Sequence, residues 1–170
     1  MKFFYQKAFT LIEILVVIAI LMLLISIALP EFSKLRKNQI LIANVSNIIS
    51  LIEKAKNQTS NSLNGESYGV YFTNNSVTLF EGTVYDAEDS NLEILNLDPG
   101  VTLELDLSEI TAPGSGENGD PTDQIYFHRL TNQVSGVGSL NLSIENHKTT
   151  KNIHIEPFGV ITILNGASKD

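Results

Sequence analysis

The sequence predicts an α+β protein, in which one long N-terminal helix packs on a C-terminal antiparallel β-sheet head. Two observations support this fold class. First, an apolar run at Leu11–Leu29 is followed, after Pro30, by apolar residues at helical spacing. Second, from Tyr68 onward apolar and polar residues alternate, as in half-buried strands, and no second helical stretch follows. A helix followed only by short strands is typical of an α+β domain rather than a parallel α/β domain.

The run Leu11–Leu29 is long and apolar enough to cross a membrane. It has 19 residues, of which only Glu13 and Ser26 are markedly polar. At a rise of 1.5 Å per residue, such a helix is about 28 Å long, close to the thickness of a bilayer's hydrocarbon core. We therefore predict one membrane-spanning segment at residues 9–30.

Glu13 has two interpretations. A carboxylate within an apolar helix costs about 2.5–3.5 kcal/mol at the membrane centre and less near an end. In a capping box, Thr10 accepts a hydrogen bond from the backbone N–H of Glu13, and Glu13 reaches back to the N–H of Thr10. Alternatively, Glu13 is an intramembrane carboxylate that pairs with a cation on a partner chain. The spacing alone leaves both interpretations open.

The string AFTLIEILVVIAIL resembles the N-terminal processing and methylation motif of type IV pilins and type II secretion pseudopilins. The resemblance implies that prepilin peptidase removes residues 1–8 as a leader, cutting between Ala8 and Phe9. It further implies N-methylation of Phe9, pairing of Glu13 with the N-terminal amine of a neighbouring subunit, and a helix kink at Pro30. One departure is that the family usually has glycine before the cut, where this chain has Ala8.

Two alternatives compete with this interpretation. A secretory signal peptide cut after Ala28, at Ser26-Ile27-Ala28, would release a secreted acidic Ca²⁺-binding domain. A plain signal anchor would leave a single-span extracellular binding module that does not assemble. Two lysines precede the span, and two lysines and an arginine follow it, so charge does not set the orientation. That the head lies outside the membrane is implied by the resemblance alone.

We predict that residues 31–58 form an amphipathic second half of the helix and that residues 59–170 form an acidic β-rich head. The helical apolar stripe consists of Leu41, Val45, Ile48, Ile49, Ile52 and Ala55. Asn57–Glu66 and Thr111–Gln124 are predicted as loops from their polar, turn-forming composition. The predicted strands are Tyr68–Phe72, Val77–Phe80, Leu92–Leu97, Val101–Leu107, Ile125–Arg129, Leu140–Ile144, Lys151–Ile155 and Val160–Leu164.

The strand and turn pattern of the head resembles that of GspH/FimT-type minor pseudopilins. The strings that carry this resemblance are YGVYF, VTLF, IYFHR, SLNLSIE and KNIHIEPFGVITI. From Ser60 onward the chain has four basic and 16 acidic residues, a net charge of −12, which repels nucleic acid. The chain has no cysteine, which excludes disulfides, thiolate metal sites and lipid attachment at cysteine.

No pattern of catalytic residues is evident. His128, His147 and His154 fall in no zinc-type spacing, His154 is expected to face solvent, and phosphate-binding loops and nucleophile motifs are absent. We therefore expect no enzyme activity. The acidic residues Glu117, Asp120 and Asp123 are candidates for a Ca²⁺ site, as is the cluster Asp86, Glu88 and Asp89. Solvated acidic loops are the expected alternative, so no cofactor is predicted.

The residues and the resemblance together predict a structural minor subunit of a type II secretion pseudopilus or a type IV pilus. The resemblance implies prepilin peptidase, an assembly platform and other pilin or pseudopilin subunits as partners. It also implies that the precursor is a single-pass protein of the bacterial inner membrane, and that the mature subunit enters a pilus or pseudopilus.

Overall fold

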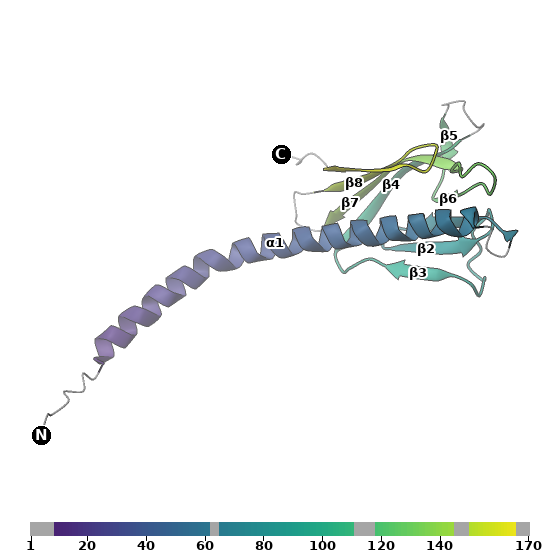
Figure 1. Ribbon diagram of the computed structural model, residues 1–170. Helices are drawn as coiled ribbons and strands as arrows, with labels where there is room; N and C mark the ends of the chain where they lie inside the picture. The colour runs from purple at the N-terminus through teal and green to yellow at the C-terminus, as the bar shows by residue number, and fades with distance from the viewer. Residues whose placement is uncertain (1–8, 62–64, 111–117, 145–149, 166–170) are drawn as a thin grey trace, which may run out of the picture. The chain divides into compact units, whose positions relative to one another are not determined.

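A computed structural model of the chain describes residues 9–61, 65–110, 118–144 and 150–165. Over these residues the chain forms one long helix, α1 (Leu11–Ser60), followed by nine strands, β1 to β9 (Figure 1). The predicted leader, residues 1–8, lies outside the described residues. The chain divides into two compact units, Met1–Arg36 and Lys37–Asp170. The predicted α+β class is confirmed.

The first unit consists, in its described part, of the N-terminal portion of α1. Its large apolar side chains between Leu11 and Leu29 are each 44% to 78% exposed, so they are not buried in a core of the described residues. Proline lacks an N–H and often breaks a helix, yet α1 continues through Pro30. By length and composition, α1 is the one helix of the described chain that is apolar enough to cross a membrane.

The second unit begins with the C-terminal portion of α1, which has one strongly buried face. Buried apolar residues recur every three or four positions, as expected for a helix that packs on one side; they are Leu41, Val45, Ile48, Leu51, Ile52 and Ala55. The predicted stripe is thus confirmed at five positions, whereas Ile49 is only partly buried.

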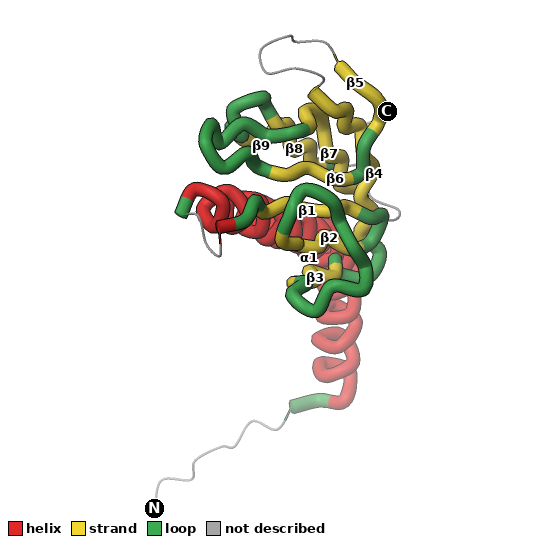
Figure 2. Tube along the Cα trace, turned by 90° about the vertical axis from the view of Figure 1, so that its right-hand side faces the viewer, coloured by secondary structure: helices red, strands yellow, loops and turns green. Residues whose placement is uncertain are grey.

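Two antiparallel sheets pack on this portion of α1 (Figures 1 and 2). The four-stranded sheet has the order β3-β2-β1-β6. Its strands are β1 (Tyr68–Phe72), β2 (Ser76–Glu81), β3 (Glu93–Asn96) and β6 (Gln124–Tyr126). Strands β1 and β2 pair around the Asn74-Asn75 turn, with Phe72 opposite Val77, so the two strands predicted at Tyr68–Phe72 and Val77–Phe80 form a hairpin.

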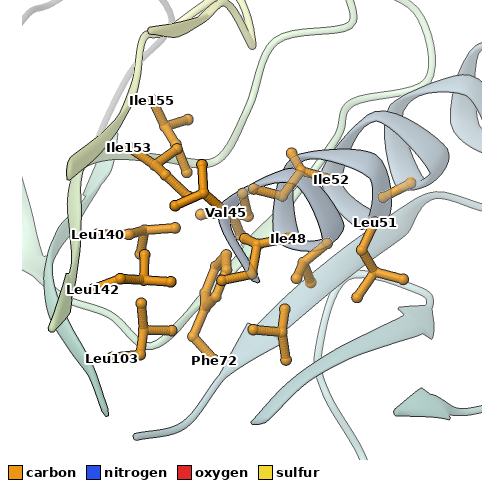
Figure 3. Close-up of a cluster of buried hydrophobic side chains, with 14 of the residues drawn as sticks. Val45, Ile48, Leu51, Ile52, Phe72, Leu103, Leu140, Leu142, Ile153 and Ile155 are labelled. Carbon is orange, nitrogen blue, oxygen red and sulfur yellow. The ribbon is translucent and has the colours of Figure 1, made fainter. Parts of the chain in front are cut away.

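The five-stranded sheet has the order β5-β4-β7-β8-β9. Its strands are β4 (Val101–Ile110), β5 (Asn118–Pro121), β7 (Gly136–Ile144), β8 (Lys151–Ile155) and β9 (Ile161–Asn165). Alternate residues of β4, β7 and β8 point toward α1, so Leu103, Leu140, Leu142, Ile153 and Ile155 are buried against it (Figure 3). This apolar layer between helix and sheets forms the core.

The loop predicted at Asn57–Glu66 starts too early, because α1 extends to Ser60. Thr59 explains the extension. Its side chain is fully buried and its Oγ1 accepts a hydrogen bond of 2.9 Å from the backbone N–H of Tyr68. The last turn is thereby tied to the first strand, a contact that local composition does not encode.

The loop predicted at Thr111–Gln124 is wrong in part, because it contains β5 and the first residue of β6. Strand β4 runs on to Ile110, and its outer edge pairs with Asn118 and Pro121 of β5. Pairing with the free edge of β4 therefore stabilises a strand at Asn118–Pro121, although the composition of this segment favours turns. Residues 111–117 of the predicted loop lie outside the described residues.

The strand predicted at Ile125–Arg129 is too long. Strand β6 ends at Tyr126, and the backbone then turns, with the N–H of Asn132 donating to the carbonyl oxygen of His128 at 2.9 Å. Asn132 is the one described non-glycine residue with a positive φ, at 53°. Asparagine tolerates this left-handed conformation, which lets the chain reverse at this point.

Candidate functional site

The candidate assembly site is the start of α1, where Phe9, Thr10 and Glu13 lie. Thr10 precedes the first helical residue and caps the helix. Its Oγ1 accepts a hydrogen bond of 3.3 Å from the backbone N–H of Glu13, and its carbonyl oxygen accepts from the N–H groups of Glu13 and Ile14. One half of the capping box is therefore present.

The other half of the capping box is missing from the described residues. No hydrogen bond joins the Glu13 carboxylate to the N–H of Thr10, and no basic group of the described chain forms an ion pair with it. The carboxylate lies in the first helical turn, where the N-terminal end of the helix dipole favours a negative charge. Glu13 thus keeps its hydrogen-bonding capacity for a group outside the described chain.

Phe9 lies two residues before the helix and is 76% exposed. The apolar side chains that follow it are exposed all along the run to Leu29. This arrangement presents a hydrophobic helical surface with, near one end, a carboxylate that has no ion-pair partner among the residues the structure describes. Such a surface requires either lipid or other apolar helices around it.

The predicted Ca²⁺ site lies partly outside the described residues. Glu117 lies outside the described residues, and Asp120 belongs to β5. Asp123 is exposed and instead contacts Tyr71. Among the described residues, no group of three or more His, Asp or Glu side chains is placed to hold a metal ion.

The second acidic cluster has local partners. Asp86 Oδ1 accepts a hydrogen bond of 3.0 Å from the backbone N–H of Glu88, and Asp89 Oδ1 accepts one of 3.0 Å from the N–H of Asn91. These are Asx-type turns, in which an aspartate side chain caps its own loop. The carboxylates therefore have a structural role in the loop between β2 and β3.

The two described histidines lie apart. His128 is exposed and meets the ring of Tyr126 edge-on, with ring centroids 5.0 Å apart. His154, predicted to face solvent, is half-buried on the outer face of the five-stranded sheet, and its Nδ1 lies 3.1 Å from Ser139 Oγ. His147 lies outside the described residues.

An aromatic cluster covers the outer face of the four-stranded sheet, and the sequence analysis missed it. The rings of Tyr71 and Tyr85 stack with centroids 4.0 Å apart, and Phe80 meets Tyr85 edge-on at 5.9 Å. Burial raises the pKa of the Tyr71 phenol above its ordinary value of 10.0, and the Asp123 carboxylate raises the pKa further by charge repulsion and by a hydrogen bond. The sequence signal that could have revealed this cluster is Tyr85, an aromatic residue within a long acidic loop.

A groove lies beside strand β9, at the edge of the five-stranded sheet. It has a volume of about 470 Å³ and is lined by residues of α1 and of the last hairpin: Ile49, Glu53, Lys56, Asn57, Gly159, Ile161 and Ile163. Sequence reasoning did not find it, because its two walls are more than a hundred residues apart in the chain.

Residues 4–29 match the prokaryotic N-terminal methylation motif. The structure of the minor pseudopilin EpsH from the Type 2 Secretion System of Vibrio cholerae is similar to this chain, with a TM-score of 0.51 and 14% sequence identity; the match covers 74% of this chain and 96% of that chain. No curated protein matches the sequence. This chain carries a prepilin methylation motif and has the pseudopilin fold. The two resemblances inferred from the sequence are therefore confirmed.

The pseudopilin fold accounts for the long helix and the β-sheet head, and the motif accounts for the apolar start of α1. The motif match ends at Leu29, the last residue before Pro30. At this level of identity the likeness to EpsH establishes the fold.

Proposed function

We propose that this chain is a structural minor subunit of a type II secretion pseudopilus or a type IV pilus. The observation that carries the proposal is the Glu13 carboxylate, which has no ion-pair partner in the described chain and lies at the start of an exposed apolar helix, within a prepilin methylation motif. In this proposal the precursor spans the inner membrane once. Prepilin peptidase cuts between Ala8 and Phe9 and methylates the new amine, and an assembly platform then moves the helix out of lipid.

The physical basis of assembly is the exchange of lipid for protein around the same surface. The side chains from Phe9 to Leu29 lose lipid contacts when the helix leaves the bilayer and regain apolar contacts against sister helices. Glu13 then accepts hydrogen bonds from the positively charged amine of a neighbouring Phe9. A charge-assisted pair in an apolar environment is strong and also fixes the register between subunits.

This role needs no catalytic site. Among the described residues the histidines lie apart and no metal-binding cluster is present. In this proposal the chain acts by assembly. The acidic head faces outward in this account and supplies the contacts with partners.

The test is the assembly of Glu13 variants. We would express Glu13→Gln and Glu13→Ala in a bacterium with the prepilin peptidase and pilus or pseudopilus machinery, and measure the protein in sheared filaments. Both variants are expected to insert into the membrane and to be lost from the filament fraction. Ser26→Ala, which removes the other polar group of the same run, serves as the control and is expected to assemble.

The competing function is a membrane-anchored binding module that never assembles. It predicts that Glu13→Ala is tolerated in every assay and that no filament fraction contains the wild-type chain. Full incorporation of Glu13→Ala into filaments would contradict the proposed role of the carboxylate.

A further inference from the structure

The five-stranded sheet ends at β9, whose outer edge has no strand partner in the described part of the chain. In an antiparallel strand, alternate residues point their N–H and C=O groups outward, so an edge strand offers a row of unpaired hydrogen-bonding groups. Natural edges are usually protected by charged side chains, proline or a bulge. Strand β9 reads Ile-Thr-Ile-Leu-Asn and has none of these features.

The groove beside β9 continues the apolar layer between α1 and the sheet. Register pairs Ile153 of β8 with Ile163, and Ile155 with Ile161, so all four side chains lie on the same face of the sheet. Ile153 and Ile155 are fully buried against α1, whereas Ile163, one strand further out, is 54% exposed. Helix α1 therefore covers β9 much less than it covers β8, and the groove lies between α1 and this exposed edge strand.

Lys56 places a positively charged group at one end of this groove. Its ammonium group donates hydrogen bonds to the carbonyl oxygens of Phe158, at 3.4 Å, and Gly159, at 3.2 Å. These acceptors are neutral, and no carboxylate of the described chain forms an ion pair with Lys56. Glu53, one helical turn earlier, lines the same groove. The end of the groove next to Gly159 thus carries an ammonium group, and no ion pair joins it to the Glu53 carboxylate among the described residues.

The topology also fixes the direction of an added strand. Every pairing in the five-stranded sheet is antiparallel. Strand β9 begins just after Gly159, next to Lys56, and runs toward the end of the groove at Ile163. A strand added antiparallel to β9 therefore ends, at its C-terminal side, beside Lys56.

We propose that the β9 edge and its groove bind an extended segment of a partner protein by strand addition. The segment runs antiparallel to β9, places uncharged apolar side chains at alternate positions over Ile49 and Ile163, and carries a carboxylate near its C-terminal end that pairs with Lys56. Main-chain hydrogen bonds supply affinity in this mode, and the alternate side chains supply specificity. A second copy of this chain fits less well, because Ile161–Asn165 offers the apolar side chains without any acidic residue.

The test uses a peptide of known sequence. KNIHITE, acetylated and amidated, copies residues 151–155, which already pair with the other edge of β9, and adds a threonine and a glutamate. In the same register its two isoleucines face α1 and its glutamate lies opposite Gly159. We would measure fluorescence anisotropy of the labelled peptide with the full-length chain in detergent, and hydrogen exchange of the β9 amides.

The wild-type chain is expected to bind with a Kd of about 1 mM or tighter, a weak interaction suited to one added strand. Binding is expected to slow amide exchange within Ile161–Asn165. Ile163→Lys and Lys56→Gln should each weaken it by about fivefold or more, since one removes an apolar contact and the other a charge-assisted hydrogen bond. Replacing the peptide's glutamate with glutamine should weaken binding to the wild type but not to Lys56→Gln.

The matched control is Ile94→Lys. Ile94 is 56% exposed on β3, the edge of the other sheet, so this variant adds the same charge at a comparable position and is expected to bind as the wild type does. Absence of binding and of exchange protection at millimolar peptide would overturn the proposal, as would equal binding to Ile163→Lys. A concentration-dependent dimer that Ile163→Lys abolishes would assign the edge to a second copy instead. None of these outcomes depends on leader cleavage or filament assembly.

Discussion

Asn44 and Asp98 hold each other by two reciprocal hydrogen bonds, which tie α1 to the turn between β3 and β4. Asn44 Nδ2 donates to Asp98 Oδ2 at 2.8 Å, and the backbone N–H of Asp98 donates to Asn44 Oδ1 at 3.2 Å. The same Nδ2 also donates to the carbonyl oxygen of Ile40 at 2.8 Å. Asn44 is only 2% exposed, and these hydrogen bonds pair both its side-chain nitrogen and its side-chain oxygen. A buried polar side chain is thereby fully hydrogen-bonded.

Asn44→Ala should lower the free energy of unfolding by about 2 kcal/mol, because it removes both bonds and leaves the Asp98 N–H without its partner. Chemical denaturation of the full-length chain in detergent measures the change. Asn47→Ala is the matched control, since Asn47 is an exposed asparagine on the same helix and should change stability by less than about 0.5 kcal/mol. Equal effects of the two substitutions would show that the Asn44–Asp98 pair contributes nothing.

Ile48→Ala should destabilise the head by about 2–5 kcal/mol, the range for truncating a fully buried aliphatic side chain. Ile48 is fully buried in the layer between α1 and the two sheets. Ile42→Ala removes the same atoms from a side chain that is 49% exposed and should cost much less. The ratio of the two losses, measured by thermal or denaturant unfolding, tests which face of α1 packs on the head.

Gly69→Ala should destabilise the four-stranded sheet. A methyl group at Gly69 would lie 2.3 Å from Cζ of Phe80 and 2.6 Å from the carbonyl oxygen of Ile125. The ring can move, but the carbonyl belongs to the paired strand β6, so the expected loss is about 1–3 kcal/mol. Gly69→Ala combined with Phe80→Leu should remain destabilised for the same reason. A Gly69→Ala chain as stable as the wild type would show that β1 and β6 separate freely.

The pKa of Tyr71 predicts a loss of stability at alkaline pH. Burial and Asp123 raise the pKa of Tyr71 in the folded chain, so the unfolded chain loses this proton first as the pH rises. The stabilising contribution is therefore complete below the ordinary pKa of 10.0 and declines as the pH passes through the raised value. Unfolding of wild type and Tyr71→Phe between neutral and strongly alkaline pH measures this difference.

Asp123→Asn provides the check on that mechanism. It removes the negative charge beside the phenol and should lower the pKa of Tyr71 toward its ordinary value, as followed by ultraviolet absorbance of the phenolate. Because burial is the larger cause, part of the rise should remain in Asp123→Asn. A Tyr71 titration unchanged by Asp123→Asn would contradict the contact between the two side chains.

The sequence predicted the local elements of the head well where one face of an element is buried. Periodicity predicts the two strands that form the β1–β2 hairpin and five of the six positions of the helical stripe from Leu41 to Ala55. Periodicity fails where both faces are covered. Phe80 points away from α1 and is nevertheless 1% exposed, because Tyr85 folds back over it. The contact between Phe80 and Tyr85, which covers this second face of the sheet, depends on the tertiary fold and not on local periodicity.

Long-range pairing accounts for the other differences. Asn118–Pro121 forms a strand because it pairs with the edge of β4. Helix α1 extends past Asn57 because Thr59 Oγ1 accepts a hydrogen bond from the backbone N–H of Tyr68. Strand order and the groove beside β9 likewise depend on contacts between distant residues. The N-terminal site is the opposite case, since Phe9, Thr10 and Glu13 are local in sequence and their motif is recognisable without a structure.

The measurement that tests the central claim most directly is the mass and N-terminal sequence of the mature protein recovered from its native membrane or surface fraction. A prepilin subunit should begin at Phe9 with a methylated amine, and Ala8 in place of glycine should still permit the cut. A mature chain beginning at Leu29 would contradict this account in favour of a secreted domain, and an intact Met1 would indicate a static membrane anchor.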